Sequence, residues 1–393
     1  MSILKKWQKS LILVLAFAVA ILGSAIVTMQ LTRREQTPVE AKTAEISAYL
    51  DRFFIDDYDE EKLADAAASA MVEATGDRWS YYLTAEEKSS YDEQMQNAYV
   101  GIGVTITAQE ELGGMRIEAV TADGPAEEAG LLTGDIITEV EGEKTLDLGM
   151  TGTRTKVRGE EGTFVTLTIL RGEESFPVSV ERRSIQTPVA TYEMLDGQIG
   201  YIKIANFDTR CAEETNAAMD ELIAQDAKAL IFDVRYNGGG YKDELVKVLD
   251  KILPEGNLFQ SEDYQGSKQI DRSDADCIDL PMAVLVNQDS YSAAEFFAAA
   301  IQEYDWGTVV GTKTVGKGNF QTAFTLSDGS MLNLSIGKYF TPNGRSLTDT
   351  GITPDVEIAL SDEDGAKLYY GQLEKADDAQ LQAAIREITQ KLS

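Results

Sequence analysis

An uncharged run from Ser10 to Thr32 is the feature that most narrows what this chain can fold into. It is long enough to cross the hydrocarbon core of a bilayer as a single helix, and three lysines precede it. A cleaved signal peptide usually has a shorter apolar region and a small-residue cleavage site. We therefore favour an uncleaved signal anchor over residues 10–32, with residues 1–9 in the cytoplasm and the folded part of the chain outside it.

The composition excludes several classes of function. The chain has 393 residues, which implies two or three domains, and its formal charge of −31 opposes binding to nucleic acid phosphates and to anionic membrane surfaces. It contains no histidine, which removes every Ser-His and Cys-His mechanism and nearly every catalytic zinc site. Cys211 and Cys277 are too few for a disulfide framework or a zinc site, although a bridge between them is compatible with a location outside the cytoplasm. We expect no metal site and no cofactor.

The pattern of apolar residues divides the chain into regions of different structure. The predicted fold class is multidomain α+β, in which a membrane helix and a helical segment precede a β-rich domain and an α/β core. The predicted regions are a helical region at 33–97, the β-rich domain at 98–184, the α/β core at 185–360 and a C-terminal helical tail at 361–393.

The sequence of the helical region at 33–97 also predicts where its helices begin and end. Two amphipathic helices are predicted on either side of a break near Asp56 to Asp59, and a later helix is predicted to begin after an N-cap at Thr84. The aromatic residues of the intervening "GDRWSYYL" are interpreted as core packing.

The segment "GTKTVGK", Gly311 to Lys317, satisfies the G-x-x-x-x-G-K frame of a nucleotide-binding P-loop. Such a loop also needs Ser or Thr after the lysine and a helix that follows. Here Gly318 follows, and the next residues alternate apolar and polar around a turn at Asp328-Gly329, which predicts a hairpin. We therefore reject the phosphate interpretation, and Lys317 needs another role.

Ser292 begins a predicted helix, "SAAEFFAAAIQEY", with Glu295 three residues further on. This spacing is typical of a capping box, which stabilises a helix by about 1 kcal/mol and requires no function. The same position would let the free N–H groups of the helix stabilise an alkoxide or a tetrahedral oxyanion. A cap and a nucleophile have the same pattern in the sequence.

A serine nucleophile in a chain without histidine needs another base, and a lysine serves if burial lowers its pKa toward neutrality. Lys317 is a candidate because it follows a predicted strand and lies among glycines that allow close approach. Ser335 and Lys338 form a competing Ser-x-x-Lys pair, but their segment is predicted as a strand, in which positions three apart face opposite ways. We discard that pair.

Three segments, "YVGIGV", "GPAEEAGLLTGDIITEVEG" and "VRGEEGTFVTLTILR", occur within residues 98–184 in an order and spacing that resemble a PDZ domain. The resemblance implies a loop of Gly101, Ile102, Gly103 and Val104 whose N–H groups bind the C-terminal carboxylate of a peptide, while the peptide pairs as an added strand. The alternative is that these glycines only shape a hairpin.

The later segments "DVRYNGGG", "VNQDSYSAAEFFAAAIQEY", "VVGTKTVGKGNFQ", "YFTPNGRS" and "GITPDVEI" resemble the carboxyl-terminal processing, or tail-specific, proteases, and the likeness covers nearly everything after the predicted membrane span. It implies a Ser–Lys dyad with Ser292 as nucleophile, Lys317 as base and Gln321 as an orienting partner. It also implies that backbone N–H groups of Gly239 and Ala293 form the oxyanion hole.

Two stretches depart from that family. This chain has "DSYSAAE", residues 289–295, where the family usually has Ser-Ala-Ser-Ala-Ser-Glu, and "NGGG", residues 237–240, where the family usually has Asn-Pro-Gly-Gly. Neither change removes a catalytic atom. We expect the extra glycine to loosen the oxyanion turn and Tyr291 to narrow the site.

Together with the uncharged run at residues 10–32, the resemblance implies a membrane-anchored, extracytoplasmic serine endopeptidase that cleaves proteins near C-terminal tails captured by the PDZ domain. Arg158 is a candidate for sensing the bound peptide, and the alternative is a solvated turn residue. A catalytically silent PDZ scaffold is the rival function, whereas a Ser-Lys signal peptidase is rejected because that chemistry needs no PDZ domain. The expected partners are proteins or peptides with free tails. The helices before Ala98 serve either as a homodimer arm or as packing on their own domain.

Overall fold

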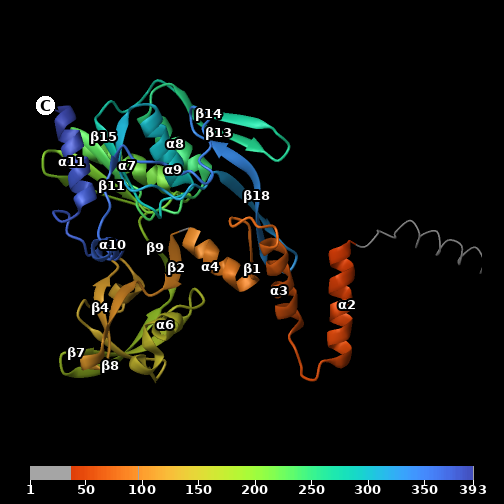
Figure 1. The fold of residues 1–393 in the computed structure, drawn as a ribbon. Helices are drawn as coiled ribbons and strands as arrows, with labels where there is room; N and C mark the ends of the chain where they lie inside the picture. The colour runs from red at the N-terminus through yellow and green to blue at the C-terminus, as the bar shows by residue number, and fades with distance from the viewer. Residues whose placement is uncertain (1–36, 96, 393) are drawn as a thin grey trace, which may run out of the picture. The chain divides into compact units, whose positions relative to one another are not determined.

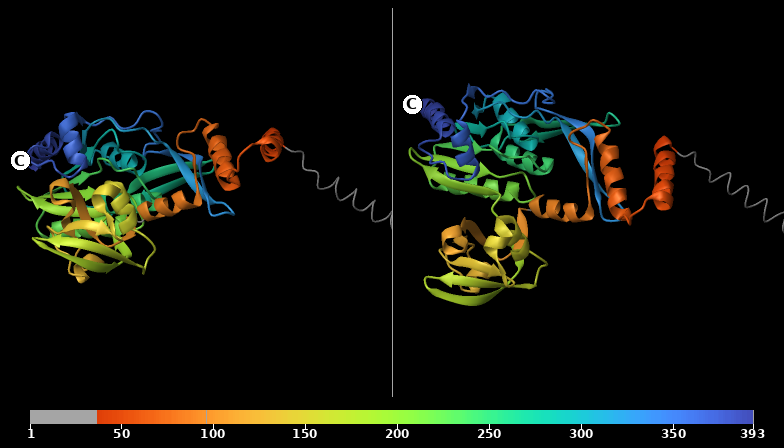
Figure 2. Two further views of the ribbon diagram at one scale, coloured as in Figure 1. Left: turned by 90° about the horizontal axis from the view of Figure 1, so that it is seen from below. Right: turned by 60° about the horizontal axis from the view of Figure 1, so that its bottom comes forward.

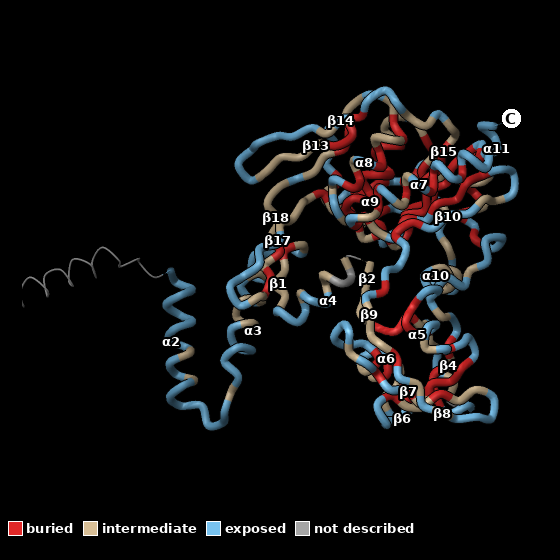
Figure 3. Tube along the Cα trace, turned by 180° about the vertical axis from the view of Figure 1, so that it is seen from behind, coloured by how far each residue is buried: buried red, intermediate tan, exposed pale blue. Residues whose placement is uncertain are grey.

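The computed structural model describes residues 37–95 and 97–392, and the chain divides into two compact units, residues 1–66 and 67–393. Helix α2 (Pro38–Phe53) begins after Thr37, whose hydroxyl accepts a hydrogen bond from the Glu40 N–H while the Glu40 carboxylate accepts one from the Thr37 N–H. Helix α3 (Glu60–Glu73) follows, which confirms the two predicted helices and the break between them. Neither helix has a buried residue, and α2 is exposed along its length in Figure 3.

No helix in the described ranges is long and apolar enough to cross a bilayer. The predicted cytoplasmic segment, residues 1–9, and the predicted membrane span, residues 10–32, lie outside those ranges.

The second unit contains a β-rich domain with its own hydrophobic cluster, in gold and olive in Figure 1. Its antiparallel sheet has the strand order β3-β4-β5-β7-β8, with β6 paired to β5. Side chains at alternate positions, such as Val165, Leu167 and Ile169, are fully buried, as expected for strands with one face on a core. The elements are β3 (Val104–Gln109), η1 (Glu110–Leu112), β4 (Gly114–Val120), α5 (Pro125–Glu128), β5 (Ile136–Val140), β6 (Glu143–Lys144), α6 (Thr145–Val157), β7 (Phe164–Arg171) and β8 (Glu174–Glu181).

A pair of short antiparallel strands, β2 (Ala98–Gly101) and β9 (Arg183–Gln186), leads into and out of this domain. Helix α4 (Ala85–Met95) precedes β2, and the Thr84 hydroxyl accepts from the Glu87 N–H at its start, which confirms the predicted N-cap.

The core is a six-stranded sheet in which five successive strands are parallel. Because each new parallel strand is added on the same side of the last, right-handed crossovers place the connecting helices on one face. Figure 3 shows the buried residues gathered in these strands and helices. The elements are β10 (Ala190–Leu195), β11 (Ile199–Ile204), α7 (Cys211–Ala224), β12 (Ala229–Asp233), α8 (Lys242–Ile252), β15 (Met282–Val286), α9 (Ala293–Glu303), β16 (Gly307–Gly311) and β19 (Val356–Glu357).

The C-terminal region, predicted as a helical tail at 361–393, contains two helices over its described residues, and the second packs on the core sheet. After α10 (Asp362–Tyr369), helix α11 (Ala379–Leu392), dark blue in Figure 2, packs Leu381 and Ile388 against the face of the sheet opposite α7, α8 and α9. A buried ion pair adds to this packing, because the Arg235 guanidinium lies 2.8 Å from the Asp378 carboxylate and 2.6 Å from that of Asp233.

A second, antiparallel sheet has the order β1-β18-β13-β14, with β17 paired to β18. Its strands are β1 (Tyr81–Leu83), β13 (Gly256–Asp263), β14 (Lys268–Ser273), β17 (Asn319–Thr325) and β18 (Met331–Phe340). The β17–β18 hairpin is the one predicted around Asp328-Gly329, and no helix follows Lys317, so the rejection of the P-loop is confirmed. Ser335 and Lys338 both lie in β18, as predicted. Cys211 is buried, Cys277 is half-buried, and both are free thiols.

The Arg235–Asp378 pair provides a test of how α11 is held. Its side chains are 2% and 4% exposed, so Asp378→Ala leaves a buried guanidinium with only Asp233 as counterion and is expected to cost about 3 kcal/mol of unfolding free energy. Urea denaturation measures the change. The control is Glu363→Ala, which removes an exposed ion pair with Lys367 and should change stability by less than about 0.5 kcal/mol. Equal effects of the two substitutions would contradict this account.

Candidate active site

The candidate catalytic loops follow three neighbouring parallel strands and therefore lie at the same edge of the core sheet. Strands β12, β15 and β16 are adjacent, with Asp233 paired to Leu285 and Val286 paired to Gly311 near their carboxyl ends. The loops that follow them carry the "NGGG" turn, Ser292 and Lys317 in that order. Ligand sites of parallel sheets form where such strands end.

Ser292 has a strained backbone at the start of α9. Its φ of 59° and ψ of −126° lie outside the extended region that an ordinary N-cap adopts, and strain of this kind concentrates at functional sites. A comparable sharp turn between strand and helix presents the nucleophilic serine of other hydrolases. The Ser292–Glu295 capping pair is formed as well, with the Ser292 N–H donating to the Glu295 carboxylate at 3.0 Å. The cap and the candidate nucleophile are therefore the same residue.

Glu295 joins the serine loop to the lysine loop. One of its carboxylate oxygens accepts from the N–H groups of Ser292 at 3.0 Å and Lys317 at 2.8 Å. The other accepts from the Gly316 N–H at 2.7 Å and from the Thr314 hydroxyl. The side chain has no exposed surface, and burial raises the pKa of Glu295 in opposition to these hydrogen bonds. Both candidate catalytic residues are thus fixed by a single buried carboxylate.

The Lys317 side chain lies between two aromatic rings. Its Nζ atom is 4.7 Å from the ring centre of Trp79 and 5.6 Å from that of Tyr291. Within the described ranges, no hydrogen bond or ion pair reaches this amine. Burial lowers the pKa of Lys317 to about 8, against the opposing negative charges of Asp77 and Glu295. At pH 7 roughly a tenth of this amine is therefore uncharged, far more than for a lysine with the ordinary pKa of about 10.4, which suits a general base.

The prediction that the aromatic residues of "GDRWSYYL" serve as core packing is corrected for Trp79, and Asp77 of the same segment also lies at the site. Pairing of β1 with β18 brings the segment to the site, where Trp79 covers Lys317 and also contacts Tyr291 at 5.8 Å between ring centres. Burial would raise the pKa of Asp77, but hydrogen bonds from Ser335 and Ser80 outweigh it and hold that pKa below its ordinary value. Asp77 is therefore a charged group near the base.

Gln321 lies on β17 and bonds within its own hairpin. Its side-chain amide donates to the Ser335 hydroxyl at 3.0 Å and to the Asn319 carbonyl at 3.1 Å. Because Ser335 in turn bonds to Asp77, Gln321 reaches the surroundings of Lys317 through two intermediates. A direct contact with Lys317 is not among its hydrogen bonds in the described structure.

The two candidate oxyanion donors differ in their surroundings. A Cβ atom on Gly239 would lie 2.7 Å from the Ser292 Cβ and 2.9 Å from the Ala293 nitrogen, so only glycine permits this approach. The Gly239 N–H, however, donates to the Asn237 side chain at 2.8 Å, and it would have to exchange this partner to bind an oxyanion. The Ala293 N–H is one of the unpaired donors at the start of α9 in the described structure.

The two departures from the family pattern contact each other. A Cβ atom on Gly238 would lie 2.6 Å from the Tyr291 hydroxyl oxygen and 2.9 Å from the adjacent ring carbon. Gly238 therefore provides the space that the Tyr291 ring occupies.

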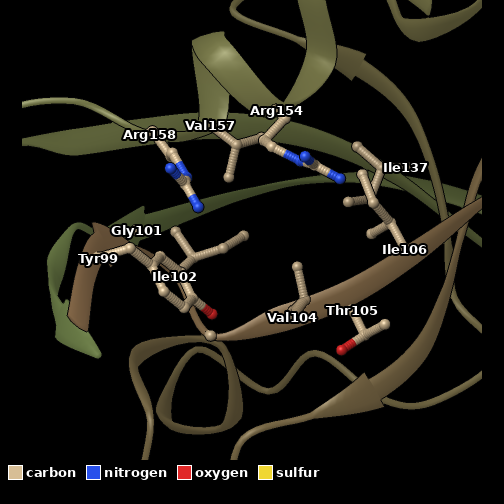
Figure 4. A pocket seen from close by; sticks show the side chains of 11 residues that line it. Tyr99, Gly101, Ile102, Val104, Thr105, Ile106, Ile137, Arg154, Val157 and Arg158 are labelled. Carbon is tan, nitrogen blue, oxygen red and sulfur yellow. The ribbon is translucent and has the colours of Figure 1, made fainter. Parts of the chain in front are cut away.

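The candidate peptide groove lies in the β-rich domain, between β3 and α6 (Figure 4). Its volume is about 250 Å³. The N–H groups of Ile102 and Gly103 have no hydrogen-bond partner in the described part of the chain, which suits an anion. The Arg158 guanidinium lies 4.9 Å from the Tyr99 ring centre at this end of the groove. The predicted residues Gly101, Ile102, Gly103, Val104 and Arg158 all line the groove.

Comparison with known proteins gives the class and then the family. A PDZ domain model matches residues 116–171, and the model of peptidase family S41 matches residues 198–358. The "Probable CtpA-like serine protease" of Staphylococcus epidermidis is 30% identical over 88% of this chain and 72% of its own. The carboxy-terminal processing protease CtpA of Bacillus subtilis is 33% identical over 81% and 68%. A Bacteroides fragilis protein assigned to the S41 proteases shares the fold, with a TM-score of 0.54 and 18% identity over 83% of this chain and 90% of that one.

A PDZ domain followed by a peptidase core defines a PDZ-containing peptidase. The chain belongs to the carboxy-terminal processing serine proteases of peptidase family S41.

The Gly238–Tyr291 contact predicts that the two positions are coupled. Gly238→Ala places a methyl group inside the Tyr291 side chain, and overpacking of this kind costs about 1–3 kcal/mol. We expect loss of peptidase activity and a lower midpoint of urea unfolding. Adding Tyr291→Ser to Gly238→Ala should recover most of the lost unfolding free energy, because it removes the clashing ring, and a double-mutant cycle in urea unfolding would quantify the coupling. Additive effects of the two substitutions would show that positions 238 and 291 are not coupled.

Proposed function

We propose that this protein is a membrane-anchored, extracytoplasmic endopeptidase that uses a Ser292–Lys317 dyad on proteins whose C-terminal tails bind the PDZ groove. The observation that most supports the dyad is the amine of Lys317, half-buried, without an ion pair in the described structure and with a pKa lowered to about 8. The backbone of Lys317 is also connected to that of Ser292, because the Glu295 carboxylate accepts a hydrogen bond from the N–H group of each.

The chemistry follows from these groups. The Ser292 hydroxyl attacks the scissile carbonyl carbon, Lys317 accepts the hydroxyl proton, and the Ala293 N–H donates to the carbonyl oxygen as it becomes negative. Collapse of the tetrahedral intermediate breaks the C–N bond, and Lys317 returns the proton to the leaving amine. Water then hydrolyses the acyl-enzyme with Lys317 again as base. Hydrogen bonds between such groups often tighten only when substrate binds.

Tail capture rests on the groove. A peptide that pairs with β3 would place its terminal carboxylate at the N–H groups of Ile102 and Gly103. Arg158 contributes positive charge at the same end.

Anchoring rests on the uncharged run at residues 10–32. The expected result is that the full-length protein is released from membranes by detergent and not by high salt. Release by salt alone would refute the anchor.

A homodimer through α2 is proposed from its exposed apolar side chains. Ile46, Tyr49 and Phe53 are 51%, 58% and 62% exposed, and such residues at helical spacing suit a helix–helix contact. Light scattering of the detergent-solubilised protein should give a dimer that Phe53→Glu converts to a monomer. A wild-type monomer would refute this contact.

The dyad is tested with the full-length protein and an unfolded substrate that has an apolar C-terminus, with products identified by mass spectrometry. Ser292→Ala and Lys317→Ala should each lower cleavage by about a thousandfold or more, because each removes a group that acts in bond making. Lys313→Ala, at an exposed lysine in the same loop, is the matched control and should retain activity. Tail binding without cleavage by all four proteins would favour the silent scaffold.

The pH dependence provides an independent prediction. Because the base acts when uncharged and the pKa of Lys317 is about 8, kcat/KM should rise about tenfold per pH unit below 8 and level off above it. Trp79→Leu exposes the amine, so its inflection should move upward toward the ordinary lysine pKa of about 10.4. A wild-type inflection near that ordinary value would contradict the role of Lys317 as a buried base.

A further inference from the structure

The PDZ groove contains a cation that tail capture as proposed above does not use. Arg154 lies in the last turn of α6, four residues before Arg158, which follows the end of the helix. The Arg154 guanidinium reaches across the groove toward Ile106 and Ile137 in Figure 4. The residue is exposed and forms no ion pair or hydrogen bond through its side chain in the described part of the chain. No acidic residue is among those that line the groove.

An unpaired arginine is notable in so acidic a chain. There are 66 acidic residues against 35 basic ones, and the nearby Lys156 and Arg183 both have carboxylate partners. Arg154 also adds favourable positive charge to the last turn of α6. That contribution explains a basic residue on this turn, but it does not require one that faces the groove.

The spacing along the groove relates Arg154 to one position of a bound tail. A peptide antiparallel to β3 with its carboxylate at Ile102 and Gly103 has its last residue opposite Val104 and its third-last residue opposite Ile106. Side chains of these two peptide residues point to the same face of the added strand, about 6.7 Å apart. The interval from Arg158, which caps the end of α6 with an N–H bond to the Arg154 carbonyl, back to Arg154 covers about 5.4–6 Å in the same direction. The third-last side chain therefore meets Arg154.

The apolar end of the groove favours an aliphatic side chain at the last residue of the bound peptide. Ile102 is 1% exposed and Val157 is 8% exposed, and both belong to the buried cluster of the domain. Together with Val104 they offer an aliphatic surface beside the carboxylate position.

We infer that Arg154 makes the PDZ groove selective for tails with Asp or Glu as the third-last residue and an aliphatic last residue. The inference rests on the proposed tail capture. Selectivity arises because the guanidinium forms charge-assisted hydrogen bonds with a carboxylate, gains less from an amide, and repels an ammonium group.

The test measures binding of three fluorescein-labelled decapeptides ending in Glu-Ala-Leu, Gln-Ala-Leu and Lys-Ala-Leu by anisotropy. The protein is the full-length chain with Ser292→Ala, so that no peptide is cleaved. Because Arg154 is exposed, we expect the Glu peptide to bind about fivefold tighter than the Gln peptide, and the Lys peptide to bind a few-fold more weakly than the Gln peptide. The differences should shrink in about 0.5 M salt.

Substitutions in this background separate the position-specific effect from general loss of binding. Arg154→Gln should equalise the three peptides while the affinity for the Gln peptide stays nearly unchanged, which also reports an intact groove. Arg154→Glu should reverse the order. The matched control is Arg158→Gln, which should weaken all three peptides together and preserve their order.

The outcomes distinguish this inference from the proposed tail capture. Equal affinity of the unsubstituted groove for all three peptides, or a charge preference that persists in Arg154→Gln, overturns the selectivity alone. A C-terminally amidated Glu-Ala-Leu peptide should bind at least tenfold more weakly than its free acid. If neither form of any peptide binds, tail capture fails and the selectivity fails with it.

Discussion

The buried carboxylate of Glu295 is the interaction on which the candidate site depends. A charge with no exposed surface is tolerated only where donors surround it, and here the donors come from both loops, namely the N–H groups of Ser292, Gly316 and Lys317 and the hydroxyl of Thr314. The loops cannot separate without leaving this carboxylate unpaired. The strained conformation of Ser292 is therefore maintained by the same contact that fixes the backbone of Lys317.

The chemistry of Lys317 reflects a balance between burial and charge. The rings of Trp79 and Tyr291 exclude water, which lowers the pKa of the amine, while Asp77 and Glu295 oppose that shift. Asp77 and Trp79 come from a segment more than two hundred residues earlier in the chain, held at the site by the pairing of Tyr81 with Asn333. Any displacement of β1 from β18 would alter the pKa of the base, so the N-terminal part of the second unit contributes to the proposed catalysis.

Local patterns in the sequence predicted the elements well and their contacts less well. Alternation of buried strands with amphipathic helices gave the core sheet, the Asp328-Gly329 turn gave the β17–β18 hairpin, and Thr84 marked the start of α4. These features depend on neighbours in the chain. The contact of Trp79 with Lys317, the packing of α11 on the sheet and the bond from the Gly239 N–H to Asn237 depend on tertiary pairing or on a side-chain rotamer. Periodicity and spacing contain no information on these contacts.

The two departures from the family pattern compensate each other in space, and this changes what they imply. Considered separately, an extra glycine suggests a looser oxyanion turn and a tyrosine suggests a narrower site. In the structure the Tyr291 ring fills the space beside Gly238 and packs against Trp79, so the ring supports the turn that the glycine would otherwise loosen. The same ring forms one wall around Lys317. The pair thus preserves the buried surroundings of the base, and the difference from the family lies in the shape of the site and not in the groups available for catalysis.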